Sequence, residues 1–190
     1  MNQNYGYVQS TPQNSGSRFS RKTLLLVGGL VAAIIIAIIL LLGSQKGNGV
    51  QVQHLLTRYD NLQTMLSDKK TTRNLKNQEL SKVVTSFNLV VTTDTNDLKT
   101  ALGTKLPAKI DDSVIIAESD ATTEKTIEDA YLENKLDVVY ADVLTKKINS
   151  LRALISETHG LSKDLKLRKT LESLDSHLRD TKKQIEDINF

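Results

Sequence analysis

Residues 165–188 read LKLRKTLESLDSHLRDTKKQIEDI, and their apolar side chains recur at alternating intervals of four and three. On an α-helix this spacing places them on one narrow stripe, as in a coiled coil of nearly four heptads. We therefore expect a C-terminal helix, capped by Ser162 with Asp164 in its first turn, that packs along one seam. This C-terminal seam is also a possible partner-binding surface. It comprises Leu167, Leu171, Leu174, Leu178, Ile185 and Ile188, with Thr181 in the remaining slot.

The segment before this helix has the same helical period. Residues 121–158 contain no glycine or proline, and their apolar residues form one broad face. This pattern predicts a single long amphipathic helix that Gly160 ends. The apolar residues are Ile127, Tyr131, Val138, Val143, Leu144, Ile148, Leu151 and Ile155.

Residues 50–92 also carry apolar residues in helical phase, in two groups. The groups are Val52, Leu55, Tyr59, Leu62 and Leu66, then Leu80, Val83, Phe87 and Val90. Because the phase is preserved, we expect one helix of roughly 40 residues, about 60 Å long. Between the groups lie four basic residues, Lys69, Lys70, Arg73 and Lys76. They form either an anion or partner site or a solvated stretch facing acidic residues of the same fold, and we favour the second interpretation.

The segments between these helices are short. Residues 92–95 supply typical helix-starting side chains, so we expect a short helix over residues 96–102 that ends at Gly103. Residues 104–112 contain Pro107 and are expected to form a loop. The apolar residues 114–117 are too few to distinguish a strand from a helix.

Together these patterns predict an all-α fold in which residues 50–190 form an elongated, coiled-coil-like antiparallel bundle of three to four helices. Charge is unevenly distributed along it: residues 110–142 hold ten acidic and two basic residues, a net charge of −8. Residues 43–109 have a net charge of +5 and residues 143–190 of +3. We expect the acidic segment to lie beside basic neighbours on either side.

Residues 23–42, TLLLVGGLVAAIIIAIILLL, contain no charge and no proline. Twenty residues of helix span about 30 Å, the thickness of a bilayer's hydrocarbon core, so we expect a single transmembrane signal-anchor helix. A cleaved signal peptide is the alternative, but its apolar region is shorter and is followed by a small-residue cleavage site. Gly29, Ala33 and Ala37 form a small-residue stripe that favours close packing against another membrane helix.

The flanking charges predict the orientation of this span. Arg18, Arg21 and Lys22 precede it and Lys46 follows it, so residues 1–22 are expected in the cytoplasm as a disordered tail. Residues 43–49 would form a flexible linker, and residues 50–190 would lie outside the cytoplasm at the cell membrane. The predicted partners are the lipid bilayer and an envelope protein or a second copy of the chain.

The sequence supplies no set of residues for catalysis, for a cofactor or for a metal. It has no cysteine, and His54, His159 and His177 lie far apart without the spacing of paired metal ligands. We expect each histidine at the surface or its boundary. Residues 43–190 carry 22 basic and 22 acidic residues, which argues against nucleic-acid binding. No small-molecule substrate is evident.

We therefore expect a non-enzymatic, membrane-anchored helical interaction or scaffold protein that binds a partner or itself through apolar seams. A pilin-like filament subunit shares this layout, but residues 16–19, GSRF, depart from the pilin processing site. A ligand-sensing bundle that acts through a membrane partner is a further alternative. An enzyme is the least favoured interpretation.

Overall fold

The computed structural model describes residues 49–190, and this part of the chain consists of helices and connecting segments without a strand. The first described helix covers residues 49–67. It is followed by α2 (Lys69–Thr72), α3 (Gln78–Leu102), a 3₁₀ turn at Gly103–Lys105, α4 (Asp112–Ala117), α5 (Ala121–Leu132), α6 (Leu136–Leu161) and α7 (Leu165–Glu186). The predicted all-α helical bundle is confirmed for this part of the chain.

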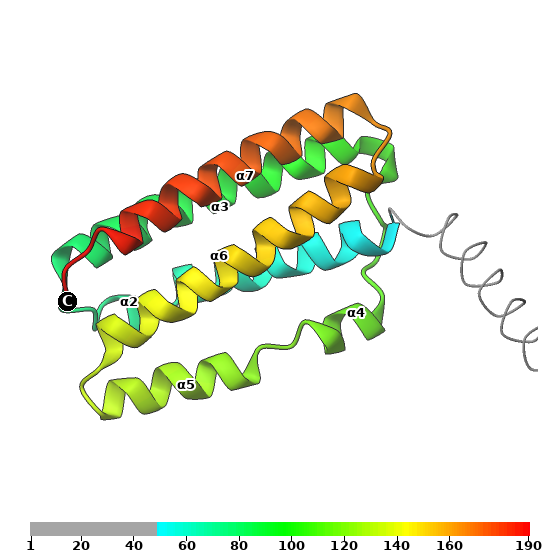
Figure 1. Cartoon of the computed structure of the whole chain (residues 1–190). Helices are drawn as coiled ribbons and strands as arrows, with labels where there is room; N and C mark the ends of the chain where they lie inside the picture. Colours follow the sequence, from blue (N-terminus) through cyan, green and yellow to red (C-terminus); the bar gives the residue numbers. More distant parts are fainter. Residues whose placement is uncertain (1–48) are drawn as a thin grey trace, which may run out of the picture. The chain divides into compact units, whose positions relative to one another are not determined.

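Four long helices form the bundle: the 49–67 helix, α3, α6 and α7 (Figure 1). α7 packs against both α6 and α3, and α5 packs along α6. Contacts between the 49–67 helix and α6 run in opposite directions along the two helices, from Gln51 with Glu157 to Met65 with Tyr140. These two helices are therefore antiparallel, and so are α3 and α7, which meet at Thr100 with Lys166 and at Asp94 with His177.

The core of the bundle is built from the periodic apolar residues. Tyr59, Phe87 and Tyr140 are fully buried with leucines and isoleucines from all four long helices. All six residues of the C-terminal seam belong to this core, and Thr181 in the remaining slot is buried too. The sequence left open whether this seam closes within one chain or between chains. In the structure it closes within the chain.

The predicted single helix over residues 50–92 is wrong, because the chain reverses direction between the 49–67 helix and α3. Asp68 caps α2 by accepting hydrogen bonds from the backbone N–H groups of Lys70 and Thr71. The Asn77 side chain caps α3 by accepting a hydrogen bond from the backbone N–H of Leu80. Leu66 and Leu80 are 14 residues apart, or two heptads, so the apolar phase survives this turn by spacing alone.

The helix break predicted at residues 92–95 is also wrong, since α3 continues through them to Leu102. The hydroxyls of Thr92, Thr93 and Thr95 each donate to the carbonyl four residues earlier, which satisfies these polar groups inside a helix. Gly103 does end the helix, as predicted, with φ 51° and ψ −120°. Residues 112–117 are helical as α4.

The predicted helix over residues 121–158 is in fact two helices, α5 and α6. Asn134 lies between them with φ 59°. The N–H groups of Asn134 and Lys135 donate to the carbonyls of Tyr131 and Ala130. This is the hydrogen-bond pattern of a Schellman motif, in which asparagine can replace the usual glycine.

The end of α6 and the start of α7 also differ from the prediction. α6 continues through Gly160 to Leu161. The N-cap of α7 is Asp164, whose carboxylate accepts from the N–H groups of Lys166 and Leu167. Ser162 Oγ accepts from the N–H of Asp164 and so supports the turn rather than capping the helix.

Several predictions concern residues outside the described part of the chain. These are the tail at residues 1–22, the span at residues 23–42 with Gly29, Ala33 and Ala37, and most of the linker at residues 43–49. Among residues 49–190, no helix is both long enough and apolar enough to cross a bilayer.

Core packing predicts that substituting two different leucines by alanine will change the free energy of unfolding by very different amounts. Leu171 is 0% exposed and Leu132 is 76% exposed. We expect Leu171→Ala to lower the free energy of unfolding by about 2–5 kcal/mol, because it leaves a cavity. The control Leu132→Ala should change it by less than about 0.5 kcal/mol. Urea unfolding of the full-length protein, followed by circular dichroism, measures both, and equal effects would contradict the packing of α7.

The two glycines at the helix ends should respond oppositely to alanine. Gly103→Ala forces a side chain into the positive-φ region and should destabilise the protein by about 1–2 kcal/mol. Gly160 lies within α6 with no atom near its missing Cβ, so Gly160→Ala should stabilise by about 0.5–1 kcal/mol. Thermal unfolding of both variants tests this, and a shift of the same sign in both would refute it.

Candidate functional site

A polar layer crosses the middle of the bundle. Asp94 on α3 is fully buried, and its Oδ1 lies 2.7 Å from Nδ1 of His177 on α7. The His177 side chain is 43% exposed, so the pair connects a buried carboxylate to solvent. Burial raises the pKa of Asp94, and the hydrogen bond from His177 only partly offsets this. The pair thus joins α3 to α7 and places a buried carboxylate beside a partly exposed imidazole.

Tyr59 and the Arg152–Asp175 pair complete this layer. Arg152 on α6 donates to both oxygens of Asp175 on α7, at 2.8 and 3.2 Å, and this pairing raises the pKa of Arg152. Burial raises the pKa of Tyr59, and the negative charges of Asp94 and Asp175 raise it further. The Tyr59 hydroxyl and Asp94 Oδ2 find no hydrogen-bond partner among the described residues. All four long helices therefore contribute a polar side chain at this level.

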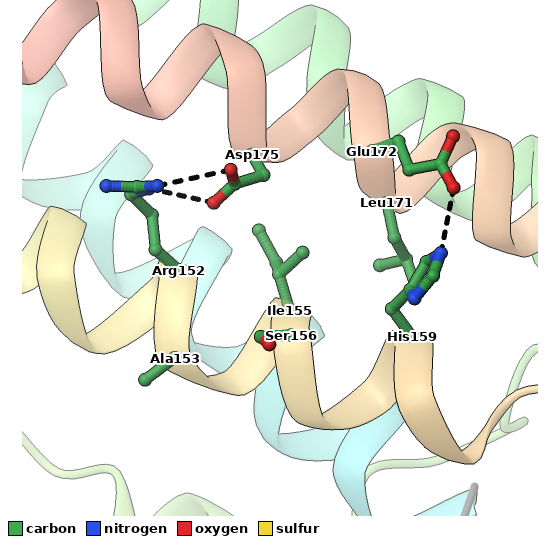
Figure 2. Close-up of a pocket in the computed structure, with 8 residues that line it drawn as sticks. All are labelled: Arg152, Ala153, Ile155, Ser156, His159, Leu171, Glu172 and Asp175. Carbon is green, nitrogen blue, oxygen red and sulfur yellow. Dashed lines mark hydrogen bonds and ion pairs between the residues drawn. The ribbon is translucent and has the colours of Figure 1, made fainter.

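A groove of about 480 Å³ lies beside the layer, between α6 and α7 (Figure 2). The Arg152–Asp175 pair closes one end, and the 2.9 Å contact between His159 Nε2 and Glu172 Oε1 closes the other. Ile155 and Leu171 line the space between them. Because Arg152 and His159 each contact a carboxylate of the opposite helix, these groups join α6 to α7 and are not directed at a ligand.

A second polar cluster holds the corner between α4 and α5. The Glu118 carboxylate accepts from Arg58 Nε at 2.8 Å and contacts His54 Nδ1 at 2.7 Å. Burial raises the pKa of this carboxyl, but the hydrogen bonds from Arg58 and His54 outweigh it, so the pKa is lowered. Asn61 donates to the Glu118 carbonyl at 2.7 Å. One face of the 49–67 helix thus binds the side chain and backbone of Glu118.

Further polar contacts fix the residues on either side of this corner. Gln53 exchanges two hydrogen bonds with Asp111, and Lys147 on α6 forms an ion pair with Asp120. Arg58 also donates to the carbonyl and hydroxyl of Ser150 on α6. The acidic segment therefore contacts the helices before and after it in sequence, as the charge distribution predicted.

We call residues 111–132, which comprise α4, the corner and α5, the acidic arm. Its apolar attachment to the bundle is small: Val114 is the buried residue of α4, and Ile127 and Ala130 are those of α5. Large apolar side chains are instead exposed on its outer side. They are Ile115, Ile116, Tyr131 and Leu132, with exposed fractions of 49%, 74%, 51% and 76%.

The structure gives each predicted candidate a definite place. His54, His159 and His177 are partly exposed, as predicted, but each contacts a carboxylate that the sequence did not indicate. Lys69, Lys70, Arg73 and Lys76 are solvent-exposed on α2 and the following turn. The Lys76 N–H donates to Asp137, which brings this basic turn beside the acidic segment. The C-terminal seam is inside the bundle.

The polar layer and the Glu118 cluster were missed from the sequence. Asp94 was read as part of a helix-starting motif, and its partner His177 lies 83 residues away. A tyrosine in an otherwise aliphatic stripe was the available signal, because a buried Tyr59 hydroxyl calls for polar neighbours.

Within residues 49–190, no group of three or more His, Asp or Glu side chains is arranged to hold a metal ion. The predictions about catalysis and cofactors are not tested by this arrangement and stay predictions. Comparisons with protein-family models, curated proteins and solved structures gave no match to this chain.

The buried Asp94 and the partly buried Glu118 should give opposite pH dependences. The lowered pKa of Glu118 means that its carboxylate stabilises the fold above an unfolded pKa of about 4, and that this stabilisation is lost as pH falls. The raised pKa of Asp94 means that its contribution is present below that pKa and is lost as pH rises.

We therefore compare wild type with Glu118→Gln and Asp94→Asn between about pH 5 and pH 3, the range around the unfolded pKa of the two carboxyl groups. As pH falls, wild type should lose its stability advantage over Glu118→Gln and gain stability relative to Asp94→Asn. Urea unfolding of the full-length proteins measures both differences. If both differences in the free energy of unfolding, wild type minus Glu118→Gln and wild type minus Asp94→Asn, changed in the same direction as pH falls, the opposite pKa shifts of Glu118 and Asp94 would be ruled out.

Proposed function

We propose that the chain is a single-pass membrane-anchored interaction protein whose helical bundle binds a partner protein through the outer face of the acidic arm. The observation that carries this proposal is the exposure of Ile116 and Leu132, each about three-quarters accessible, on a strongly acidic surface. Ile115 lies next to Ile116 on α4 and Tyr131 next to Leu132 on α5, so each end of the arm exposes two large apolar side chains. Exposed apolar patches often mark contact sites.

The arm replaces the binding surface that the sequence suggested. The C-terminal seam is the stronger apolar pattern, but its residues are buried against the other helices of the same chain. A partner would have to displace α3 or α6 to reach them. The exposed residues of α4 and α5 require no such rearrangement.

The anchoring part of the proposal is supported by the sequence of residues 23–42 and its flanking charges. We propose that residues 1–22 face the cytoplasm and that the bundle faces outward at a cell envelope. A labelling reagent that cannot cross lipid should then modify Lys163, which is exposed, and spare Lys22 in intact cells. The reverse pattern, or recovery of the protein in the soluble fraction, would contradict the anchor.

Binding through the arm is tested by placing a photo-crosslinking amino acid in the full-length protein in intact cells. We compare position 132 on α5 with position 89 on α3, where Leu89 is 68% exposed. A discrete crosslinked protein should appear at position 132 and not at position 89. It should disappear when Ile116→Asp is added, since that change places a charge in the contact.

Identical products at the two positions, or a product at position 132 that Ile116→Asp leaves unchanged, would refute the proposal. So would the absence of any product at position 132. Circular dichroism of each variant controls for folding, which these exposed substitutions should leave intact.

A further inference from the structure

The outer side of α5 presents one regular row of side chains. Glu124, Glu128 and Leu132 are four residues apart and all exposed, while Ile127 and Ala130 face the bundle. Residues spaced by four form a ridge along a helix, and such a ridge packs into the groove between rows of a second helix. The ridge from Glu124 to Leu132 is about 12 Å long, so it can receive roughly two turns of a partner helix.

The charge along this ridge is not neutralised within the described part of the chain. Glu124 and Glu128 form no ion pair among residues 49–190, whereas Glu118 and Asp120 of the same arm contact Arg58 and Lys147. The arm lies in a segment with a net charge of −8. Lys125 is the one basic residue of the arm and lies 3.9 Å from Asp129, so the arm as a whole keeps a net negative charge. Exposed apolar side chains lie near its two ends, Ile116 on α4 and Leu132 on α5.

We propose that this ridge binds a basic amphipathic helix of another protein, with Lys or Arg opposite Glu124 and Glu128 and apolar residues over Leu132 and Ile116. The inference rests on the proposed function and specifies the chemistry of its partner. Charge complementarity sets the orientation and speeds association, and apolar burial at the two ends supplies most of the affinity.

A second copy of the chain fits the ridge less well. One basic group of the described residues, Lys69 to Lys76, lies on a four-residue helix and a turn, which are too short to follow the length of α5. The other, Lys163 to Lys169, lies at the start of α7, whose apolar seam is buried within its own bundle. A contact between either group and the arm would also be head-to-tail, which produces open chains of molecules instead of a closed dimer.

The test uses the full-length protein in nanodiscs of zwitterionic lipid and a labelled peptide of about 20 residues, made of leucine and lysine in helical amphipathic order. Empty nanodiscs control for lipid binding. A peptide with glutamate in place of lysine controls for charge, and a scrambled sequence controls for amphipathic order. Fluorescence anisotropy at low and high salt gives the dissociation constants.

We expect saturable binding of the basic amphipathic peptide alone, weakened by salt. Glu124→Gln combined with Glu128→Gln should raise the dissociation constant by roughly two- to thirtyfold. The matched control Asp97→Asn with Asp180→Asn removes two exposed acids from α3 and α7 and should leave it unchanged. Leu132→Ser should weaken binding at both salt concentrations.

Equal weakening by the two double variants would overturn the inference, because it would indicate attraction to net charge alone. Binding of the acidic or scrambled peptide as tightly as the basic one, or no saturable binding, would overturn it as well. Crosslinking at position 132 tests the proposed function independently of the partner's chemistry. A partner captured there that lacks a basic amphipathic helix contradicts only the inference, and crosslinking to a second copy does the same.

Discussion

Burial of the C-terminal seam is the constraint on which the rest of this structure depends. Leu171, Leu174 and Leu178 are at most 1% exposed and come from a helix that contacts both α3 and α6. Full burial of each leucine contributes on the order of 1.5–3 kcal/mol. α7 therefore joins two helices that are themselves distant in sequence.

The polar layer adds specificity to this apolar seam. Leucine stripes tolerate a shift by one heptad, because the same apolar contacts re-form after the shift. Asp94 with His177 and Arg152 with Asp175 fix both faces of α7 at one level of the bundle. A shifted register would leave a fully buried carboxylate without its imidazole, which is strongly unfavourable.

The acidic arm is attached by a different kind of contact. Its buried apolar residues are few, and its position is set by Glu118, Asp120 and Asp111, which contact polar side chains of the 49–67 helix and α6. Polar, partly exposed contacts each stabilise a structure by about 1 kcal/mol or less. The arm is thus held mainly by contacts that each contribute little, and it also exposes large apolar side chains, Ile116 and Leu132 among them.

Helical period and end signals were sufficient to predict the helix content, the C-terminal seam and the end of α3 at Gly103. They were insufficient to predict the two turns at which the chain reverses direction, between the 49–67 helix and α3 and between α5 and α6. At residues 68–77 the apolar phase resumes after two heptads, so the turn leaves no mark on the period. At residues 133–135 the turn depends on Asn134 in a left-handed conformation, which few residues other than glycine adopt.

The candidate site was harder to predict than the fold, because its contacts are long-range. His54 and Glu118 are 64 residues apart, and Asp94 and His177 are 83 apart. Which charged groups meet depends on which helices become neighbours, and the missed reversals changed those neighbours. The net charge of the acidic segment did predict its contacts with basic helices on both sides, since that preference does not require the exact partner.

Native-state hydrogen exchange of the full-length protein tests the central claim most directly, because it reports the opening free energy of each helix separately. If the seam closes within one chain, amides of α7 should exchange as slowly as those of α3 and α6, at a rate independent of protein concentration. Amides of α5 should exchange faster. Exchange of α7 as fast as α5, or protection of α7 that grows with protein concentration, would contradict this account.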